Sequence, residues 1–227
     1  MNKNIFSLVI IFSVLLIHNN NFCTTEQISG WWDFCLDNTV SYKLFEEWLG
    51  DIDSASRVNT RNYIKKQSYN SILDIACGLC IDYFGFKKDN VAITYKGIDF
   101  SRKLVAKAQE KGIDVSFGDI ENIELPDDSF DIVYGRHILE HLKYYDKALS
   151  EAIRIAKKEV LIVFFIKPSD KKEDVIDLGF LDGHSVYHNK YSQSKFVEYV
   201  LSHEKVDHCY WENINEKEMI AHIYIKN

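Results

Sequence analysis

Short apolar runs alternate with helical patterns between Ser71 and Phe165, and this alternation limits what the chain can fold into. The runs SILDIA, AITYKGIDF, DVSFGDI, SFDIVYG and EVLIVFF have the length and apolar content of buried strands. Between them, Ser101 is placed to cap a helix, and apolar residues recur at helical spacing from Ala148 to Ala156. Strands that alternate with helices form right-handed crossovers, so we predict a doubly wound α/β fold around a mostly parallel sheet.

The flanking segments complete the sheet and define the domain organisation. Ser192 begins a predicted helix, and alternating runs at 206–211 and 219–225 predict an antiparallel strand pair at the sheet edge, which makes seven strands. An amphipathic stripe within residues 44–49 predicts a helical cap. The predicted parts are an apolar segment (1–24) and one domain (25–227), composed of the cap (25–66), the core (71–166), a cover segment without clear periodicity (167–190) and the terminal helix and strand pair (191–227).

The N-terminus carries an apolar run from Ile5 to Ile17 that follows Lys3 and precedes polar residues. This outline predicts a secretory signal peptide or a signal anchor. The run is shorter than the roughly 20 residues of a full bilayer crossing. The segment around Phe22 also lacks a small-x-small cleavage pattern. A buried or interfacial helix is therefore the alternative.

Composition and charge exclude several classes of protein. With 46% hydrophobic and 27% charged residues, the 227-residue chain has too much apolar material for a disordered protein. The net charge of -7 does not suit a surface that displaces counterions from phosphates, so no nucleic-acid partner is expected. Five cysteines without even, regular spacing do not indicate a disulfide framework, which favours a reducing compartment.

The turn after the first strand, LDIACGLC, indicates which ligand the sheet binds, because doubly wound folds bind ligands at the carboxyl ends of their strands. A dinucleotide fingerprint would place glycines at three positions that hold Ala76, Gly78 and Ile81 in this chain. The carboxylate of Asp74 would repel a pyrophosphate but attract a ligand with an ammonium and a sulfonium. S-adenosylmethionine is such a ligand.

Two more aspartates follow at strand ends. Asp99 ends the second strand, about twenty residues further on, where a carboxylate can accept both hydroxyls of a ribose. Asp119 ends the third strand, where an acceptor can bind the amino group of adenine. Together with Asp74, these residues predict S-adenosylmethionine as the cofactor.

In this order, SILDIACGLC, YKGIDFSRKLVAKA and GDIENIELPDDSFDIVYGRHILEHL resemble the motifs of class I S-adenosylmethionine-dependent methyltransferases, in particular the small methyltransferase-domain family of ubiquinone-biosynthesis type. The resemblance runs from Ser71 to Phe165. It implies a Rossmann-like methyltransferase fold and methyl transfer to O, N or C of a small-molecule or lipid acceptor. The cofactor-binding residues that it implies are Asp74, Ala76 and Gly78 at the methionine part, Asp99 and Phe100 at the ribose and adenine, Asp119 and Ile120 at the base, and Arg136 after the fourth strand. The usual glycines are replaced by Ala76 and Cys80, and Cys80 is expected to narrow the pocket or to weaken binding.

Candidates for the general base are residues expected to lie near the methyl group of the bound cofactor. His137 directly follows the fourth strand, and Tyr191 follows His184 and His188 of the cover segment. His137 and Tyr191 are the predicted catalytic residues, because histidine titrates near neutrality and tyrosine can relay a proton. No metal is expected at the histidine pairs or at the C-x-x-C pair of the first turn, which lack further ligands at suitable spacing.

Two other functions stay open. Ala76 and Cys80 are consistent with a catalytically silent module that binds the cofactor or nothing. The architecture is shared with nicotinamide-dependent oxidoreductases, which Asp74 and the missing third glycine disfavour. Because S-adenosylmethionine is made in the cytosol, we expect a cytoplasmic domain or, with the apolar segment as an anchor, a domain on the cytoplasmic side of a membrane. A true signal peptide would instead export the domain.

Overall fold

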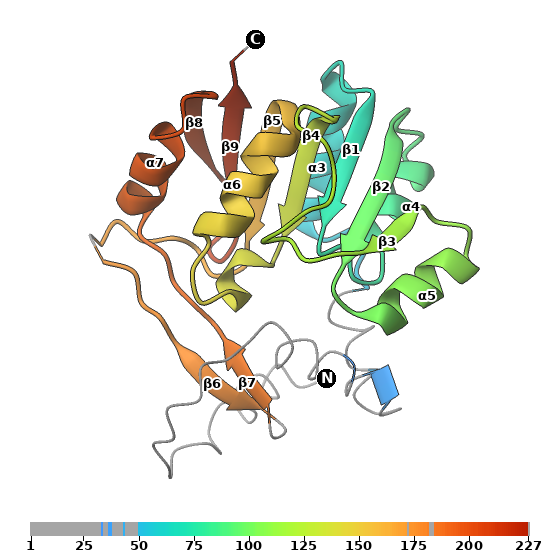
Figure 1. Ribbon diagram of the computed structural model, residues 1–227, viewed down its shortest axis with the longest axis horizontal. Helices are drawn as coiled ribbons and strands as arrows, with labels where there is room; N and C mark the ends of the chain where they lie inside the picture. Colours follow the sequence, from blue (N-terminus) through green and yellow to red (C-terminus); the bar gives the residue numbers. More distant parts are fainter. Residues whose placement is uncertain are drawn as a thin grey trace.

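A computed structural model describes residues 50–171, 173–181 and 184–226, together with Asp33, Leu36, Asp37 and Lys43. Its main element is a seven-stranded sheet with the order β3-β2-β1-β4-β5-β9-β8 (Figure 1). The strands are β1 (Ser71–Ile75), β2 (Thr94–Asp99), β3 (Val115–Phe117), β4 (Phe130–Arg136), β5 (Ala156–Phe164), β8 (Val206–Asn213) and β9 (Met219–Ile225). The first five are parallel, whereas β9 is antiparallel to both β5 and β8. The predicted doubly wound fold with an antiparallel edge pair is therefore confirmed.

Helices cover both faces of this sheet, as the alternation in the sequence predicts. They are α3 (Ala55–Lys66), α4 (Ile81–Lys88) and α5 (Arg102–Glu110) on one face, and α6 (Asp146–Ile155) and α7 (Gln193–Leu201) on the other. In Figure 1, α6 lies in front of the sheet and α3 behind it. α6 and α7 bury apolar side chains such as Leu149 and Phe196 against the strands. Since both faces are packed, the carboxyl edge of the sheet is the place where polar side chains collect.

The α3 helix packs through polar side chains, which explains why no apolar periodicity marks it in the sequence. Its buried residues are mostly polar: Ser56, Arg57, Thr60, Arg61 and Ile64. The Arg57 guanidinium binds Asp82 of α4 at 3.2 Å. The Tyr63 hydroxyl donates to Glu159 of β5 at 2.9 Å. This helix lies within the predicted cap, and polar contacts to α4 and to the sheet hold it in place.

The predicted cover segment contains a second, two-stranded sheet. β6 (Leu178–Leu181) pairs antiparallel with β7 (His184–Tyr187), and the hairpin projects away from the main sheet (Figure 1). The Asn189 amide donates to the Leu142 carbonyl at 2.6 Å and ties the hairpin to the 3-10 turn η2 (Leu139–His141) after β4. The sequence pattern did not predict this hairpin, because strands of four residues are too short for a clear alternation.

The predictions for the N-terminal segment and for the amphipathic stripe within residues 44–49 lie outside the described residues, which include none of residues 1–32 or 44–49. Within the described part, no helix is both long and apolar enough to cross a membrane. The signal or anchor segment and the domain boundaries drawn around it therefore stay predictions.

Candidate functional site

The loop after β1 has a left-handed backbone at three positions, although only one of them is glycine. The φ angles are 60° at Ala76, 54° at Gly78 and 56° at Cys80. The Cys80 N–H donates to the Cys77 carbonyl at 2.9 Å and closes a tight turn. A Cβ added to Gly78 would meet no atom within 4 Å, so this side of the turn is open. The Cys80 side chain is fully buried in the apolar core on the side of the sheet that α3 and α4 cover.

The strain at Ala76 gives a testable prediction. Ala76→Gly is expected to raise the free energy of unfolding by about 1 kcal/mol, because a Cβ is costly in the left-handed region. Urea denaturation of both proteins measures the difference. Ala92→Gly is the control, because Ala92 is exposed and has no positive φ, so this variant should lose stability. If Ala76→Gly also lowers the free energy of unfolding, the Cβ of Ala76 does not strain the backbone at this position.

Asp99 at the end of β2 contacts this loop directly. Its two carboxylate oxygens accept from the backbone N–H groups of Gly78 and Ser101, each at 2.8 Å. Burial raises the pKa of Asp99, and these two donors oppose the shift. Because each carboxylate oxygen has a further lone pair, Asp99 can still accept the two hydroxyls of a ribose.

The next residues along this edge place aromatic rings near a carboxylate. The ring centroids of Phe100 and Phe117 are 5.4 Å apart. Asp119 accepts from the Glu121 N–H at 2.9 Å through one of its oxygens. The Ile120 side chain is buried in the core, so its backbone rather than its side chain can face a ligand. Aromatic rings beside polar acceptors suit a flat heterocycle such as adenine.

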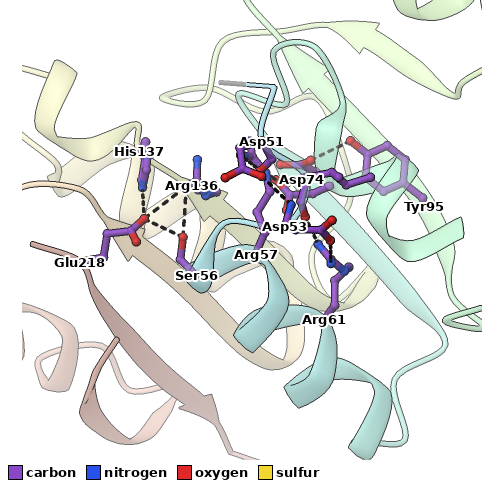
Figure 2. A network of polar contacts seen from close by, with 12 residues as sticks. Asp51, Asp53, Ser56, Arg57, Arg61, Asp74, Tyr95, Arg136, His137 and Glu218 are labelled. Atoms are coloured by element: carbon purple, nitrogen blue, oxygen red, sulfur yellow. Dashed lines mark hydrogen bonds and ion pairs between the residues drawn. The ribbon is translucent and has the colours of Figure 1, made fainter. Parts of the chain in front are cut away.

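Asp74 at the end of β1 lies on the side of the sheet covered by α3 and α4 (Figure 2). The residue is 3% exposed, and its carboxylate accepts from the Tyr95 hydroxyl at 2.7 Å. Burial and the nearby carboxylate of Asp82 raise the pKa of Asp74 well above its ordinary value. A cationic ligand at this end of the sheet would lower that pKa again, so the Asp74 carboxylate suits an ammonium or sulfonium partner.

Four polar side chains from distant parts of the chain meet where β4 ends (Figure 2). The Oε1 atom of Glu218 lies 3.1 Å from His137 Nε2 and 3.3 Å from Arg136 Nη2. The same oxygen accepts from the Ser56 hydroxyl at 2.6 Å. Sequence reasoning found Arg136 and His137 but missed Glu218, because this residue lies just before β9, 81 positions from His137, without a local motif.

Burial and hydrogen bonding set the protonation of this cluster. Burial lowers the pKa of His137 to about 4, so its ring is neutral at physiological pH. Burial alone would raise the pKa of Glu218, but hydrogen bonds from His137, Ser56 and Asn215 lower it to about 2. The cluster therefore contains a carboxylate paired with a guanidinium, and a neutral imidazole that can accept a proton.

Tyr191 does not lie at this site, which corrects the prediction that it acts on the acceptor. The residue is 1% exposed, and its hydroxyl donates to the Leu139 and Leu142 carbonyls at 2.8 and 2.9 Å. A tyrosine with these partners supports the η2 turn.

His188 of the cover segment does not extend the site. His188 packs against His141, with ring centroids 5.4 Å apart, and the side chain of His184 lies outside the described part of the chain. His141 is buried beside the hairpin, where its Nδ1 lies 2.9 Å from the Tyr187 carbonyl oxygen. Among the described residues, no group of three or more His, Cys, Asp or Glu side chains could hold a metal ion.

Gly97 of β2 makes room for the loop cysteine. A Cβ at this position would lie 2.7 Å from Cys77 Sγ. Gly97→Ala is therefore expected to lower the free energy of unfolding by about 1–3 kcal/mol, measured by urea denaturation. Cys77→Ala in the same chain should restore part of that loss. If Gly97→Ala costs the same with and without Cys77, the proposed clash does not exist.

Residues 73–164 match a family model described as a methyltransferase domain. The chain is 31% identical over 104 residues to ajmaline N-methyltransferase of Rauvolfia serpentina, across 41% of this chain and 34% of that protein. It is 27% identical over 144 residues to demethylmenaquinone methyltransferase of Listeria monocytogenes, across 58% of this chain and 55% of that protein. The chain thus spans only a third to about half the length of these relatives.

The fold is similar to a solved structure, the PH0226 protein of Pyrococcus horikoshii. The TM-score is 0.61 at 17% sequence identity, over 83% of this chain and 100% of the other. At this identity the likeness shows the fold alone. The matched family segment runs from β1 to the end of β5, so it contains the loop after β1, Asp99, Asp119 and His137.

Proposed function

Because residues 73–164 place this chain in the class I S-adenosylmethionine-dependent methyltransferase family, we propose that the protein transfers a methyl group from S-adenosylmethionine to an O, N or C atom of a small-molecule or lipid acceptor. One observation carries this proposal. Asp74, Asp99 and Asp119 stand at the carboxyl ends of three neighbouring parallel strands, beside an open left-handed loop. A site for a pyrophosphate would not collect carboxylates in this way.

The residues present fit this cofactor part by part. Asp99 offers acceptors for the ribose hydroxyls, and the ring of Phe100, which packs against Phe117, would lie beside the adenine. Asp119 and the Ile120 backbone would bind the edge of the base. Asp74 and the open face at Gly78, with Ala76 in the same turn, would hold the methionine part. Arg136 completes the set next to the reaction centre.

The cofactor supplies a methyl group on a positively charged sulfur. The residues of this chain orient the acceptor, exclude water and hold a proton acceptor nearby, because an in-line displacement depends mainly on position. His137 has a neutral ring whose Nε2 faces the Glu218 carboxylate, so Nδ1 is the nitrogen that can take a proton from an O–H or N–H acceptor. Arg136 and Ser56 hold the Glu218 side chain in place.

His137→Asn tests the assignment of the base. It is expected to lower kcat by about 100-fold and to leave the affinity for S-adenosylhomocysteine unchanged. The rate is measured with an acceptor found by screening phenols, amines and lipids. His208→Asn in β8 is the matched control, since that side chain is 56% exposed, pairs with Asp207 and lies on the edge strand of the sheet. An unchanged kcat in His137→Asn would remove it as the base.

Calorimetric titration of the protein with S-adenosylhomocysteine tests the cofactor. Micromolar binding that nicotinamide dinucleotides do not reproduce would support the proposal and exclude the oxidoreductase alternative. Binding without methylation of any screened acceptor would favour a catalytically silent module. A folded protein that binds neither ligand would overturn the proposal.

The cofactor also bears on where the domain works. Since S-adenosylmethionine is made in the cytosol, we propose a cytoplasmic domain, with the apolar run Ile5–Ile17 as a membrane anchor that would bring a lipid acceptor within reach. Protease treatment of sealed membrane vesicles measures the orientation. Digestion of the domain from the cytoplasmic side is the expected result, and protection from that side would contradict it.

A further inference from the structure

The loop after β1 contains two thiols that have no role in the proposed methyl transfer. The Sγ atoms of Cys77 and Cys80 are 3.7 Å apart, and neither residue is in a disulfide. The backbone between them forms a turn closed by the Cys80 N–H and the Cys77 carbonyl at 2.9 Å. Such a turn holds its first and last Cα atoms within about 7 Å, and disulfides bridge Cα atoms up to about 6.8 Å apart. A bond between the two sulfurs therefore requires little movement of the backbone.

The surroundings of the two thiols differ. Cys80 is fully buried at the start of α4, whereas Cys77 is partly exposed and packs over Gly97. The hydrogen bond between the sulfurs lowers the pKa of Cys80, and the same bond together with burial raises the pKa of Cys77. Cys80 therefore ionises before Cys77, and the Cys77 sulfur lies 3.7 Å from the Cys80 sulfur.

We infer that Cys77 and Cys80 form a redox modification site, which a peroxide converts to a disulfide within the cofactor loop. The first thiolate attacks one oxygen of hydrogen peroxide, the O–O bond breaks, and a sulfenic acid and water form after proton transfer. The second thiol then loses its proton and attacks that sulfur, which forms the S–S bond and releases a second water. The thiols lose two electrons and two protons, and the peroxide is reduced to two waters.

This site is linked to the cofactor through shared backbone. Gly78, between the two cysteines, donates its N–H to Asp99 at 2.8 Å. A ligand that occupies Asp99 and the open side of Gly78 would cover the loop and restrict its motion. We therefore expect bound S-adenosylhomocysteine to slow oxidation by about threefold or more, and oxidation to change the affinity for the ligand in turn. This link rests on the proposed function, whereas disulfide formation does not.

Peptide mapping of the intact chain tests disulfide formation. The reduced protein is treated with hydrogen peroxide, alkylated and digested with trypsin, which releases residues 67–87 with Cys77 and Cys80 as their only cysteines. The expected product is a disulfide-containing peptide, which is two hydrogen atoms lighter than the reduced peptide and carries no alkyl group. Treatment with dithiothreitol before alkylation should give back the reduced peptide, with both cysteines alkylated. Cys77→Ser and Cys80→Ser should each abolish this product. Cys209→Ser, which removes a partly exposed thiol in β8, should leave it unchanged.

The outcomes separate this inference from the proposed function. A 67–87 peptide that stays fully alkylated, or one that is cross-linked to another cysteine, would overturn the modification site. If the disulfide forms but calorimetry detects no S-adenosylhomocysteine binding, the proposed function fails and the modification site stands. If the ligand binds without slowing oxidation, the link between the two is wrong.

Discussion

Asp99→Ala should reduce the affinity for S-adenosylhomocysteine by roughly 100-fold or more, the largest binding effect expected for a single side chain of this protein. The reason is that Asp99 would accept two hydrogen bonds from the ribose, and bonds to a charged acceptor contribute about 1.5–3 kcal/mol each. Asp99 also organises the site before the ligand arrives, through its contacts to Gly78 and Ser101. Calorimetric titration of the variant and the wild-type protein measures the change.

Two further variants make this result interpretable. Asp114→Ala is the matched control, because this carboxylate has a 64% exposed side chain, pairs with Lys96 and lies just before β3. Its affinity should equal that of the wild-type protein. Asp99→Asn keeps the size of the side chain and guards against a loss that reflects unfolding. If a folded Asp99→Asn or Asp99→Ala protein binds as tightly as the wild type, the ribose assignment is wrong.

Glu140→Gln should make the protein more stable above pH 7, by about 3 kcal/mol at the upper limit. Glu140 is fully buried, and its Oε1 accepts from the Phe165 and Ile166 N–H groups at 2.6 and 3.1 Å. Burial raises the pKa of this carboxyl to about 7 from 4.5. A glutamine can accept the same two hydrogen bonds and resembles the protonated carboxyl, without the cost of a buried charge.

The pH dependence follows from the direction of that shift. Below about pH 4.5 the carboxyl is protonated in both the folded and the unfolded chain, so its contribution to stability is fully present. As the pH rises toward 7, the unfolded chain releases the proton first, and this contribution is progressively lost. Urea denaturation at pH 5 and pH 8 should therefore show a stabilising effect of Glu140→Gln mainly at pH 8. The control is Glu124→Gln at an exposed position, and equal effects of the two substitutions would contradict the prediction.

Much of the fold could be predicted because its signals are local. A buried strand appears as a short apolar run, and a helix start appears as a capping residue. Both predicted caps are present, with Ser101 accepting from the Leu104 N–H at 3.2 Å and Ser192 accepting from the Lys195 N–H at 3.3 Å. These preferences act within a few residues, so they can be recognised without knowledge of the partners.

The same reasoning identified part of the site. Asp74, Asp99 and Asp119 end or follow successive parallel strands, and the geometry of such a sheet brings strand ends to one edge. Their placement therefore needed only the order of the elements.

Other features depended on tertiary contacts and left no local signal. The sequence suggested a catalytic role for Tyr191, but its hydroxyl donates to the carbonyls of Leu139 and Leu142, which lie far away in the sequence. The polar face of α3 has no apolar period, because its partners are charged side chains of α4 and of the sheet. A sequence pattern records how a segment meets water or an apolar core, and it does not record a polar partner elsewhere in the chain.

The cluster at the end of β4 combines residues that the sequence predicts with one that only the tertiary structure reveals. The sequence by itself determined that the chain forms a doubly wound sheet and that three carboxylates and His137 stand at its carboxyl edge. Only the tertiary structure decided that Glu218 is the partner of His137, because β9 returns antiparallel beside β5 and brings the residue before it to that edge. The physical reason is range: propensity and periodicity act over a few residues, whereas this contact depends on the order of all seven strands.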